Sequence, residues 1–231
     1  MKTGPGRGGF SDEYWKENYS TPLEMDNVGN RKLHINYIKS FLALEYTDIS
    51  SIADYGFGLG YLFLEAIKTF KPYRAYGLEP SETAFIKGEK RLINFQTNKL
   101  PSMKLKLEKI DLLDWAQRYR EERQKYTKHK AYDLGFCTSV FQYLSDDEIL
   151  LVSEELAHAN KIIYFSVPTD NELKKQREEV EFTDRFAIRR SREKYIELMS
   201  KHFTFVGNRF LESKIHYNEE TTPFSELLFR F

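Results

Sequence analysis

Short apolar runs alternate with longer amphipathic stretches through most of this 231-residue chain. Five of the runs have the length of strands: Ser51–Tyr55, Arg74–Leu78, Met103–Ile110, Ala131–Phe136 and Lys161–Val167. Helical spacing of apolar residues is found over 31–46, 60–70, 82–97, 112–126, 146–159 and 171–201. Alternation of this kind predicts a parallel sheet with helices on both faces.

The end of the chain departs from this alternation. Two further β-like segments, Phe203–Leu211 and Phe224–Phe231, are joined through the turn-rich piece Tyr217–Pro223, with no crossover helix between them. Such a connection favours an antiparallel pair. We therefore expect an α/β fold with a doubly wound, mostly parallel sheet of seven strands and an antiparallel C-terminal strand pair.

Charge and cysteine content exclude several classes of protein. Lys and Arg number 35, as do Asp and Glu, so the net charge of zero removes any whole-chain attraction to nucleic acid or to an anionic membrane. No run approaches the roughly 18 apolar residues that a membrane-spanning helix needs. The sole cysteine, Cys137, excludes an intrachain disulfide and a multi-cysteine metal cage and favours a reducing cytoplasm. No cluster has the spacing of a metal site, so no metal is expected.

The segment most informative about function follows the first predicted strand and reads Asp54-Tyr55-Gly56-Phe57-Gly58-Leu59-Gly60. Alternating glycines at a strand end let the backbone turn with positive φ and bring its N–H groups close to a ligand, at the positive end of the next helix. A dinucleotide loop reads G-x-G-x-x-G, whereas Gly60 lies only two residues after Gly58. Asp54 would repel a pyrophosphate and suits a cation or an ammonium group.

This segment resembles the first motif of the class I S-adenosylmethionine-dependent methyltransferases, D/E-x-G-x-G-x-G, at all four marked positions. The resemblance implies a Rossmann-like methyltransferase domain over residues 50–231. It also implies S-adenosylmethionine as the cofactor, S-adenosylhomocysteine as the product, and a cofactor contact for the loop residues Gly56, Phe57, Gly58 and Gly60.

Acidic residues at two further strand ends agree with this interpretation. Glu79, which precedes Pro80, lies twenty-five residues after Asp54, and a carboxylate there can accept hydrogen bonds from both ribose hydroxyls. After the third strand, the resemblance implies that Asp111 accepts from the adenine amino group and that the backbone N–H of Leu112 meets the ring. Asp111 and Asp114 are also suited to capping the helix that follows.

The segment Tyr132–Leu144 resembles the family's fourth strand and the loop after it. The resemblance implies that Thr138 and Ser139 run along the methionine part of the cofactor and that Tyr143 flanks the transfer site. No N/D-P-P-Y motif is present, which disfavours methylation of amino groups of DNA bases or glutamine. An isolated cysteine in an apolar strand, Cys137, indicates packing rather than nucleophilic chemistry.

Residues 1–49 precede the methyltransferase-like domain as an N-terminal tail and a lid or helical extension. This part commonly forms a lid in the family resembled. The candidate substrate residues within it are Tyr14, Trp15, Tyr19 and His34. Such aromatic side chains can enclose a sulfonium through cation–π contacts, and they are equally suited to forming an edge of the core.

The sequence thus predicts an S-adenosylmethionine-dependent methyltransferase whose acceptor is more readily a small molecule or a protein side chain than a nucleic acid. Two basic stretches, Arg118–Lys130 and Arg185–Lys194, are typical of solvated surface but leave a phosphate-bearing acceptor open. No catalytic residue or oligomeric state is predicted. Two other functions remain open: a non-catalytic cofactor-binding or regulatory module, and a nucleotide-dependent oxidoreductase on a related fold.

Overall fold

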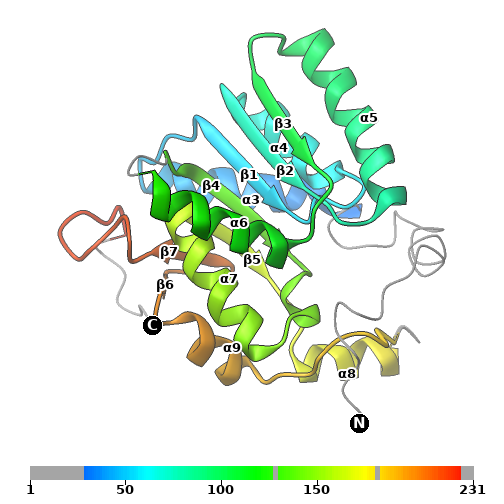
Figure 1. Ribbon diagram of the computed structural model, residues 1–231, viewed down its shortest axis with the longest axis vertical. Helices are drawn as coiled ribbons and strands as arrows, with labels where there is room; N and C mark the ends of the chain where they lie inside the picture. The colour runs from blue at the N-terminus through cyan, green and yellow to red at the C-terminus, as the bar shows by residue number, and fades with distance from the viewer. Residues whose placement is uncertain (1–28, 127–129, 180–182, 225–231) are drawn as a thin grey trace.

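A seven-stranded sheet in the order β3-β2-β1-β4-β5-β7-β6 lies at the centre of residues 29–126, 130–179 and 183–224, the parts of the chain that a computed structural model describes (Figure 1). The strands are Ser51–Tyr55 (β1), Arg74–Leu78 (β2), Lys104–Glu108 (β3), Tyr132–Thr138 (β4), Asn160–Ser166 (β5), Phe203–Phe205 (β6) and Phe210–Ser213 (β7). Strands β1 to β5 pair in parallel, whereas β7 is antiparallel to both β5 and β6. The doubly wound, mostly parallel sheet expected from the sequence is confirmed.

Helices cover both faces of this sheet. They are Arg31–Leu44 (α3), Tyr61–Phe70 (α4), Glu82–Lys99 (α5), Leu112–Lys125 (α6), Asp146–Ala159 (α7), Asp170–Glu179 (α8) and Arg192–Met199 (α9), with a 3₁₀ turn at Phe141–Tyr143 (η3). Trp115 of α6, Leu156 of α7 and Leu198 of α9 belong to the core on the face nearer the viewer in Figure 1. The core on the other face includes apolar side chains of α3, α4 and α5.

Local sequence explains where these elements begin. All five residues of β1 are buried, as expected for a central parallel strand that is covered on both faces. Helices α5, α7 and α9 start after Ser81, Ser145 and Ser191, and each serine side chain accepts a hydrogen bond from a backbone N–H of the first turn. Ser145 and Glu148 form a full capping box. These caps fix the point at which the chain leaves each loop at the carboxyl edge of the sheet.

The single helical region predicted over 171–201 is wrong. Helix α8 ends at Glu179, and α9 begins only at Arg192. Between them, the Asp184 carboxylate accepts hydrogen bonds from the backbone N–H groups of Phe186 and Ala187 at 3.1 and 3.2 Å. A side chain that bonds its own backbone in this way offers a non-helical alternative.

The strand predicted over 203–211 is also wrong, because it contains a hairpin. Strand β6 ends at Phe205, the chain turns around Gly207, and β7 starts at Phe210. The N–H of Val206 donates to the carbonyl of Phe210 at 3.0 Å, which closes the turn. The antiparallel partners are therefore β6, β7 and β5. Of the other predicted strand, residues 225–231 lie outside the described residues.

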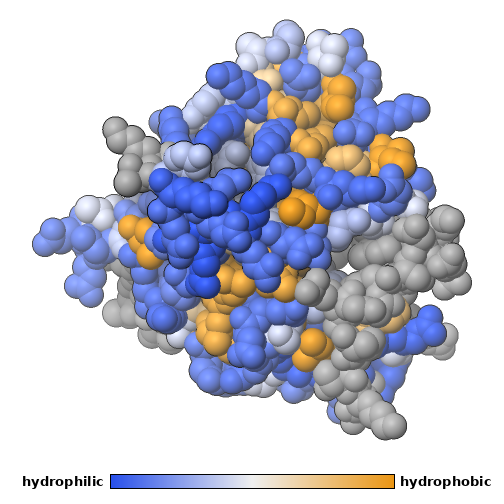
Figure 2. Space-filling model, in the orientation of Figure 1, coloured by the Kyte–Doolittle hydropathy of each residue, from blue (hydrophilic) through white to orange (hydrophobic). Residues whose placement is uncertain are grey.

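The molecular surface on the viewer's side is mostly hydrophilic, with smaller hydrophobic areas between (Figure 2). Among the helices of the described residues, none is long and apolar enough to cross a membrane.

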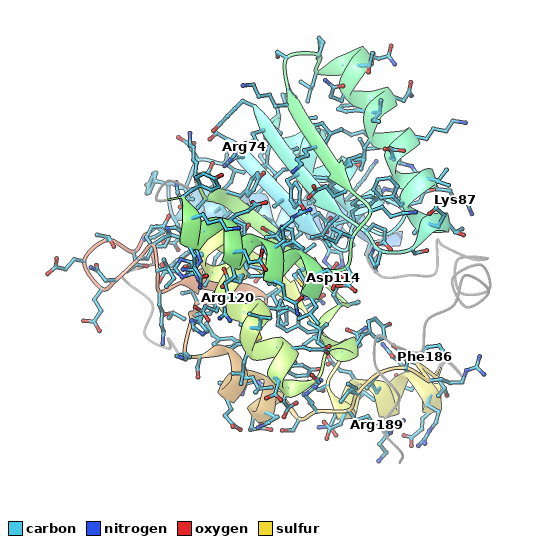
Figure 3. The ribbon with its side chains drawn as sticks, viewed as in Figure 1. Arg74, Lys87, Asp114, Arg120, Phe186 and Arg189 are labelled. Carbon is cyan, nitrogen blue, oxygen red and sulfur yellow. The ribbon has the colours of Figure 1, made fainter. Side chains whose placement is uncertain are left out.

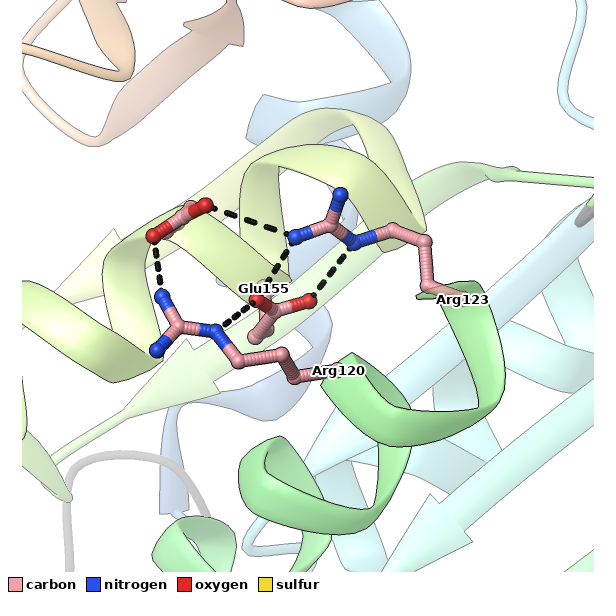
Figure 4. A network of polar contacts seen from close by, with 4 residues as sticks. Arg120, Arg123 and Glu155 are labelled. Atoms are coloured by element: carbon pink, nitrogen blue, oxygen red, sulfur yellow. Dashed lines mark hydrogen bonds and ion pairs between the residues drawn. The ribbon is translucent and has the colours of Figure 1, made fainter. Parts of the chain in front are cut away.

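A network of ion pairs joins α6 to α7 (Figure 4). The Glu155 carboxylate is fully buried and accepts from Nε of Arg120 at 3.0 Å and from Nε of Arg123 at 3.0 Å. The neighbouring Glu154, whose side chain is 31% exposed, pairs with the same two arginines. Two arginines of the first basic stretch, Arg120 and Arg123, therefore hold α6 and α7 together.

We expect Glu155→Ala to lower the free energy of unfolding by about 2 kcal/mol, because it leaves two partly exposed arginines without their buried partner. Glu154→Ala is the matched control and should cost less than about 1 kcal/mol, since its carboxylate is largely solvent-screened. Urea unfolding of both variants measures this difference. Equal losses of unfolding free energy in the two variants would show that the buried Glu155 carboxylate stabilises the fold no more than the partly exposed Glu154 does.

Candidate active site

The loop between β1 and α4 turns at glycines with positive φ, which are +111° at Gly56, +54° at Gly58 and +72° at Gly60. A Cβ atom on Gly56 would lie 2.7 Å from Cγ2 of Val140, closer than real side chains approach. Gly60 is the N-cap residue of α4 and has a left-handed conformation. Gly56 is therefore required by the shape of the loop, and positive φ favours glycine at Gly58 and Gly60, where the loop leads into the positive end of a helix.

Helix α5 supports this loop from one side through Gly88, a residue that the sequence analysis missed. A Cβ atom on Gly88 would lie 2.6 Å from the ring of Phe57 and 2.9 Å from the carbonyl oxygen of Gly58. Arg91, one turn further along α5, donates to the carbonyl of Leu59, and its guanidinium lies 3.8 Å from the centre of the Tyr61 ring. The only signal in the sequence was a glycine inside a helical pattern, where glycine is unfavourable.

Two buried carboxyl groups, those of Asp54 and Glu79, lie at the ends of the neighbouring strands β1 and β2. They are 3% and 4% exposed. Burial raises the pKa of Asp54 well above its usual value, and the nearby Glu79 raises it further. Burial also raises the pKa of Glu79 to about 7, against the effect of hydrogen bonds from Ser81 and Gly58. Paired carboxyls held in this way at one edge of a sheet are typical of a functional site.

The Glu79 carboxylate connects the glycine loop to the start of α5. One oxygen accepts from the backbone N–H of Gly58 at 2.9 Å, and the other accepts from the N–H of Ser81 at 2.9 Å. A carboxylate oxygen can accept more than one hydrogen bond, so each retains capacity for a ligand hydroxyl. Pro80, the next residue, is exposed beside it. The structure thus brings Glu79 to the loop, although the sequence showed only that both follow strands.

Asp111 caps α6, and its Oδ1 accepts from the backbone N–H of Asp114 at 2.8 Å. Of the two residues suited to capping this helix, the structure selects Asp111. Leu112 is 3% exposed and belongs to the core under α6. Both residues follow β3 at the carboxyl edge of the sheet, which is the edge that holds Glu79 and the glycine loop.

Thr138 ends β4 at the same edge, and Ser139 is the first residue after the strand. Ser139 is exposed, has a φ of +57° and donates from its N–H to the carbonyl of Ser166 at 2.8 Å. Left-handed backbone at a non-glycine residue is a form of strain that often occurs at functional sites. Tyr143, on η3, donates from its hydroxyl to Asp184 at 2.8 Å. The segment before α9 therefore lies against the loop that follows β4.

His34 is buried on α3 and lies 2.6 Å from the hydroxyl of Tyr164, measured at Nδ1. Nη1 of Arg209 lies 3.2 Å from the same ring nitrogen. This placement puts the imidazole in a polar cluster between α3 and the sheet. The other candidate substrate residues of the N-terminal part lie outside the described residues: Tyr14, Trp15 and Tyr19.

The residues present fit the cofactor that the resemblance implies. The loop provides left-handed backbone that favours glycine, and Asp54 and Glu79 provide buried acceptors for a cationic or hydroxyl-bearing ligand. Among the described residues, no group of three or more His, Cys, Asp or Glu side chains is arranged to hold a metal ion.

No known family model and no curated protein sequence matches the chain. Solved structures are similar to it. An S-adenosylmethionine-dependent methyltransferase from Clostridium acetobutylicum ATCC 824 matches with a TM-score of 0.59 and 10% identity, covering 87% of this chain and 98% of the other. The magnesium protoporphyrin IX methyltransferase ChlM from Synechocystis PCC 6803, with bound S-adenosylhomocysteine, matches with a TM-score of 0.55 and 14% identity, covering 90% and 94%.

The small RNA methyltransferase HEN1 is also similar, with a TM-score of 0.57 and 15% identity over 83% of this chain. The match spans only 26% of the length of HEN1. At these identities the likeness establishes the fold alone. The chain therefore has the fold of the class I S-adenosylmethionine-dependent methyltransferases.

Proposed function

We propose that this protein is an S-adenosylmethionine-dependent methyltransferase. The observation that carries the proposal is the pair of buried carboxyls, Asp54 and Glu79, beside a loop whose three glycines all have positive φ. An ionised Asp54 beside this loop would repel a pyrophosphate and attract a cationic ligand, whereas Glu79 can accept from an adenosine ribose, which both kinds of cofactor contain. This electrostatic argument favours the sulfonium cofactor over a dinucleotide, and it supports a methyltransferase over an oxidoreductase.

When bound, S-adenosylmethionine supplies an activated methyl group and a neutral leaving group, so little covalent chemistry is required of the protein. Glu79 would accept hydrogen bonds from the ribose hydroxyls, and the buried Asp54 carboxyl at the end of β1 would be stabilised in its ionised form by a cationic ligand. Residues of the β4 loop, including Ser139 and Tyr143, border the side from which an acceptor approaches. Catalysis is then mainly alignment, which can lower a barrier by on the order of 7 to 11 kcal/mol at best.

We further propose that residues 50–231 form the catalytic domain and that residues 1–49 contribute to the acceptor side as a lid or extension. We also propose that the protein acts in a reducing cytoplasm, because its single cysteine is buried and forms no disulfide. The acceptor is a small molecule or a protein side chain, in keeping with a chain of zero net charge.

Calorimetric titration with S-adenosylmethionine, S-adenosylhomocysteine and NAD tests the proposed function, after the preparation has been shown to be free of carried-over cofactor. We expect micromolar binding of both sulfur compounds and no binding of NAD. Binding of NAD instead would favour an oxidoreductase. Cofactor binding without methyl transfer to any of a broad set of acceptors would favour a non-catalytic module.

The affinity for S-adenosylhomocysteine should depend on pH. Because the pKa of Glu79 is about 7 and ribose hydroxyls donate to its ionised form, binding below that pH must release a proton. The affinity should therefore fall by up to about tenfold from pH 8 to pH 6, and Glu79→Gln should make the dependence shallower. Titrations across this range measure it, and an affinity that does not change with pH would contradict the ribose contact.

A further inference from the structure

The two basic stretches of the sequence differ in how far their charges are neutralised. In the first, Arg118 pairs with Glu108 at 2.6 Å, and Arg120 and Arg123 pair with Glu154 and Glu155. These guanidinium groups hold α6 against its neighbours. They therefore offer little charge to a ligand.

In the second stretch, Arg190 is also internal. It is 6% exposed, its Nε lies 2.6 Å from Asp146, and its Nη2 donates to the carbonyl of Leu144 at 2.5 Å. The preceding residue, Arg189, instead lines an open hollow of about 460 Å³ against α8. We call this the α8 hollow, and its lining residues are Asp170, Asn171, Lys174, Arg177 and Arg189.

The lining of the α8 hollow carries three cationic side chains and one carboxylate. Arg177 lies 3.3 Å from the exposed Glu178, but within the described residues neither Lys174 nor Arg189 forms an ion pair. Lys174 and Arg177 lie on successive turns of α8, so they face the same side of the helix. Three cations that converge on one hollow favour an anion, and arginine favours phosphate or carboxylate oxygens.

The hollow lies near the loop that follows β4, which is the side proposed above for the acceptor. Helix α8 follows β5 closely, and the carbonyl of Ser166, the last residue of β5, accepts the N–H of Ser139. Arg189 comes from the segment whose Ile188 N–H donates to the carbonyl of Gln142 at 2.7 Å, next to Tyr143. Figure 3 shows Phe186 and Arg189 beside α8, well apart from Arg120 of the first basic stretch.

We propose that the α8 hollow binds a phosphate group of the methyl acceptor, so that the acceptor is a small phosphate ester. The role of this ligand as a methyl acceptor rests on the proposed function. The phosphate site itself is inferred from the charges of its lining residues. Asp170, in the lining of the same hollow, can accept a hydrogen bond from a hydroxyl of the same ligand. The compact patch, with the three arginines of the first basic stretch paired with carboxylates, matches one or two phosphates and not an extended nucleic-acid backbone.

Binding of ribose 5-phosphate, inorganic phosphate and a single-stranded RNA of about twenty nucleotides tests the proposal. Each is titrated into the full chain in the presence of saturating S-adenosylhomocysteine, whose own binding is measured first. This order separates the proposed function from the proposed phosphate site. Failure of S-adenosylhomocysteine to bind would count against the proposed function, whereas failure of the phosphate compounds to bind would count against the α8 hollow.

We expect saturable binding of ribose 5-phosphate. The double variant Lys174→Glu/Arg177→Glu should weaken it about tenfold or more while leaving the binding of S-adenosylhomocysteine unchanged. The matched control is Lys99→Glu/Lys104→Glu, which makes the same change in charge with exposed lysines at the end of α5 and the start of β3. The control should bind ribose 5-phosphate within about twofold of the parent.

Three results would overturn the proposal. The first is equal binding of ribose 5-phosphate by the parent and the double variant. The second is the absence of saturable binding of either phosphate compound to the parent at millimolar concentrations. The third is tight RNA binding in which the logarithm of the association constant falls with the logarithm of the salt concentration with a slope steeper than about −2. Three cations that contact the phosphates of a single strand account for a slope of about −2 at most.

Discussion

Replacing Glu79 with alanine is expected to weaken the binding of S-adenosylhomocysteine about 100-fold. The side chain is 4% exposed and lies where two strand ends and the glycine loop meet. Two hydrogen bonds from ribose hydroxyls to a buried carboxylate, at about 1.5 kcal/mol each, account for this loss. Isothermal calorimetry at pH 8, where the carboxyl is mostly ionised, measures it directly.

Glu82→Ala is the matched control for this prediction. Glu82 lies three residues further on, in the first turn of α5, and its half-exposed carboxylate pairs with Lys109. Its removal should change the affinity less than about threefold. An affinity of Glu79→Ala within threefold of the parent would show that the ribose is not held at this carboxylate.

Gly56→Ala is expected to lower the free energy of unfolding by about 3 kcal/mol and to abolish cofactor binding. Part of the cost is backbone strain, because a φ of +111° is rarely adopted by an L residue. The remainder is a contact of 2.7 Å between the new Cβ atom and Cγ2 of Val140. Urea unfolding and the calorimetric titration measure the two effects.

Two further variants separate these causes. The double variant Gly56→Ala/Val140→Ala removes the close contact but keeps the backbone strain. Gly56→Ala should therefore lower the free energy of unfolding by less in the Val140→Ala background than in the parent, but not by zero. Gly207→Ala serves as the control, because its Cβ atom would meet only ordinary contacts, the nearest at 3.4 Å from Phe41. A cost for Gly56→Ala as small as that for Gly207→Ala would show that the loop does not depend on this glycine.

The parallel part of the fold could be predicted from sequence because its signals are local. Strand β1 is a short run of buried residues and β3 alternates Lys with Leu, and Ser81 and Ser145 cap helices where an N-cap residue is expected. The glycine loop was predicted for the same reason. Its positions with positive φ favour glycine, so the loop is visible in the sequence as glycines at fixed spacing. Such features are determined by a few neighbouring residues, so they can be predicted without knowing how the rest of the chain folds.

The features that the sequence did not predict depend on contacts between distant residues. Asp184, in the non-helical segment before α9, accepts from the backbone N–H of Phe186 and from the hydroxyl of Tyr143, which lies 41 residues away. Gly88 makes room for Phe57, which lies on a loop some thirty residues earlier. Arg120 and Arg189 look alike in the sequence, yet one pairs with a buried carboxylate and the other lines a hollow. Residue type and spacing cannot distinguish these two environments.

A crystal structure of the protein with S-adenosylhomocysteine tests the central claim most directly. We predict that both ribose hydroxyls lie within hydrogen-bond distance of the Glu79 carboxylate, with the glycine loop against the ligand and the adenine near Asp111 and Leu112. A ligand bound elsewhere, or a ribose that does not contact Glu79, would contradict the assignment of this edge of the sheet as the cofactor site.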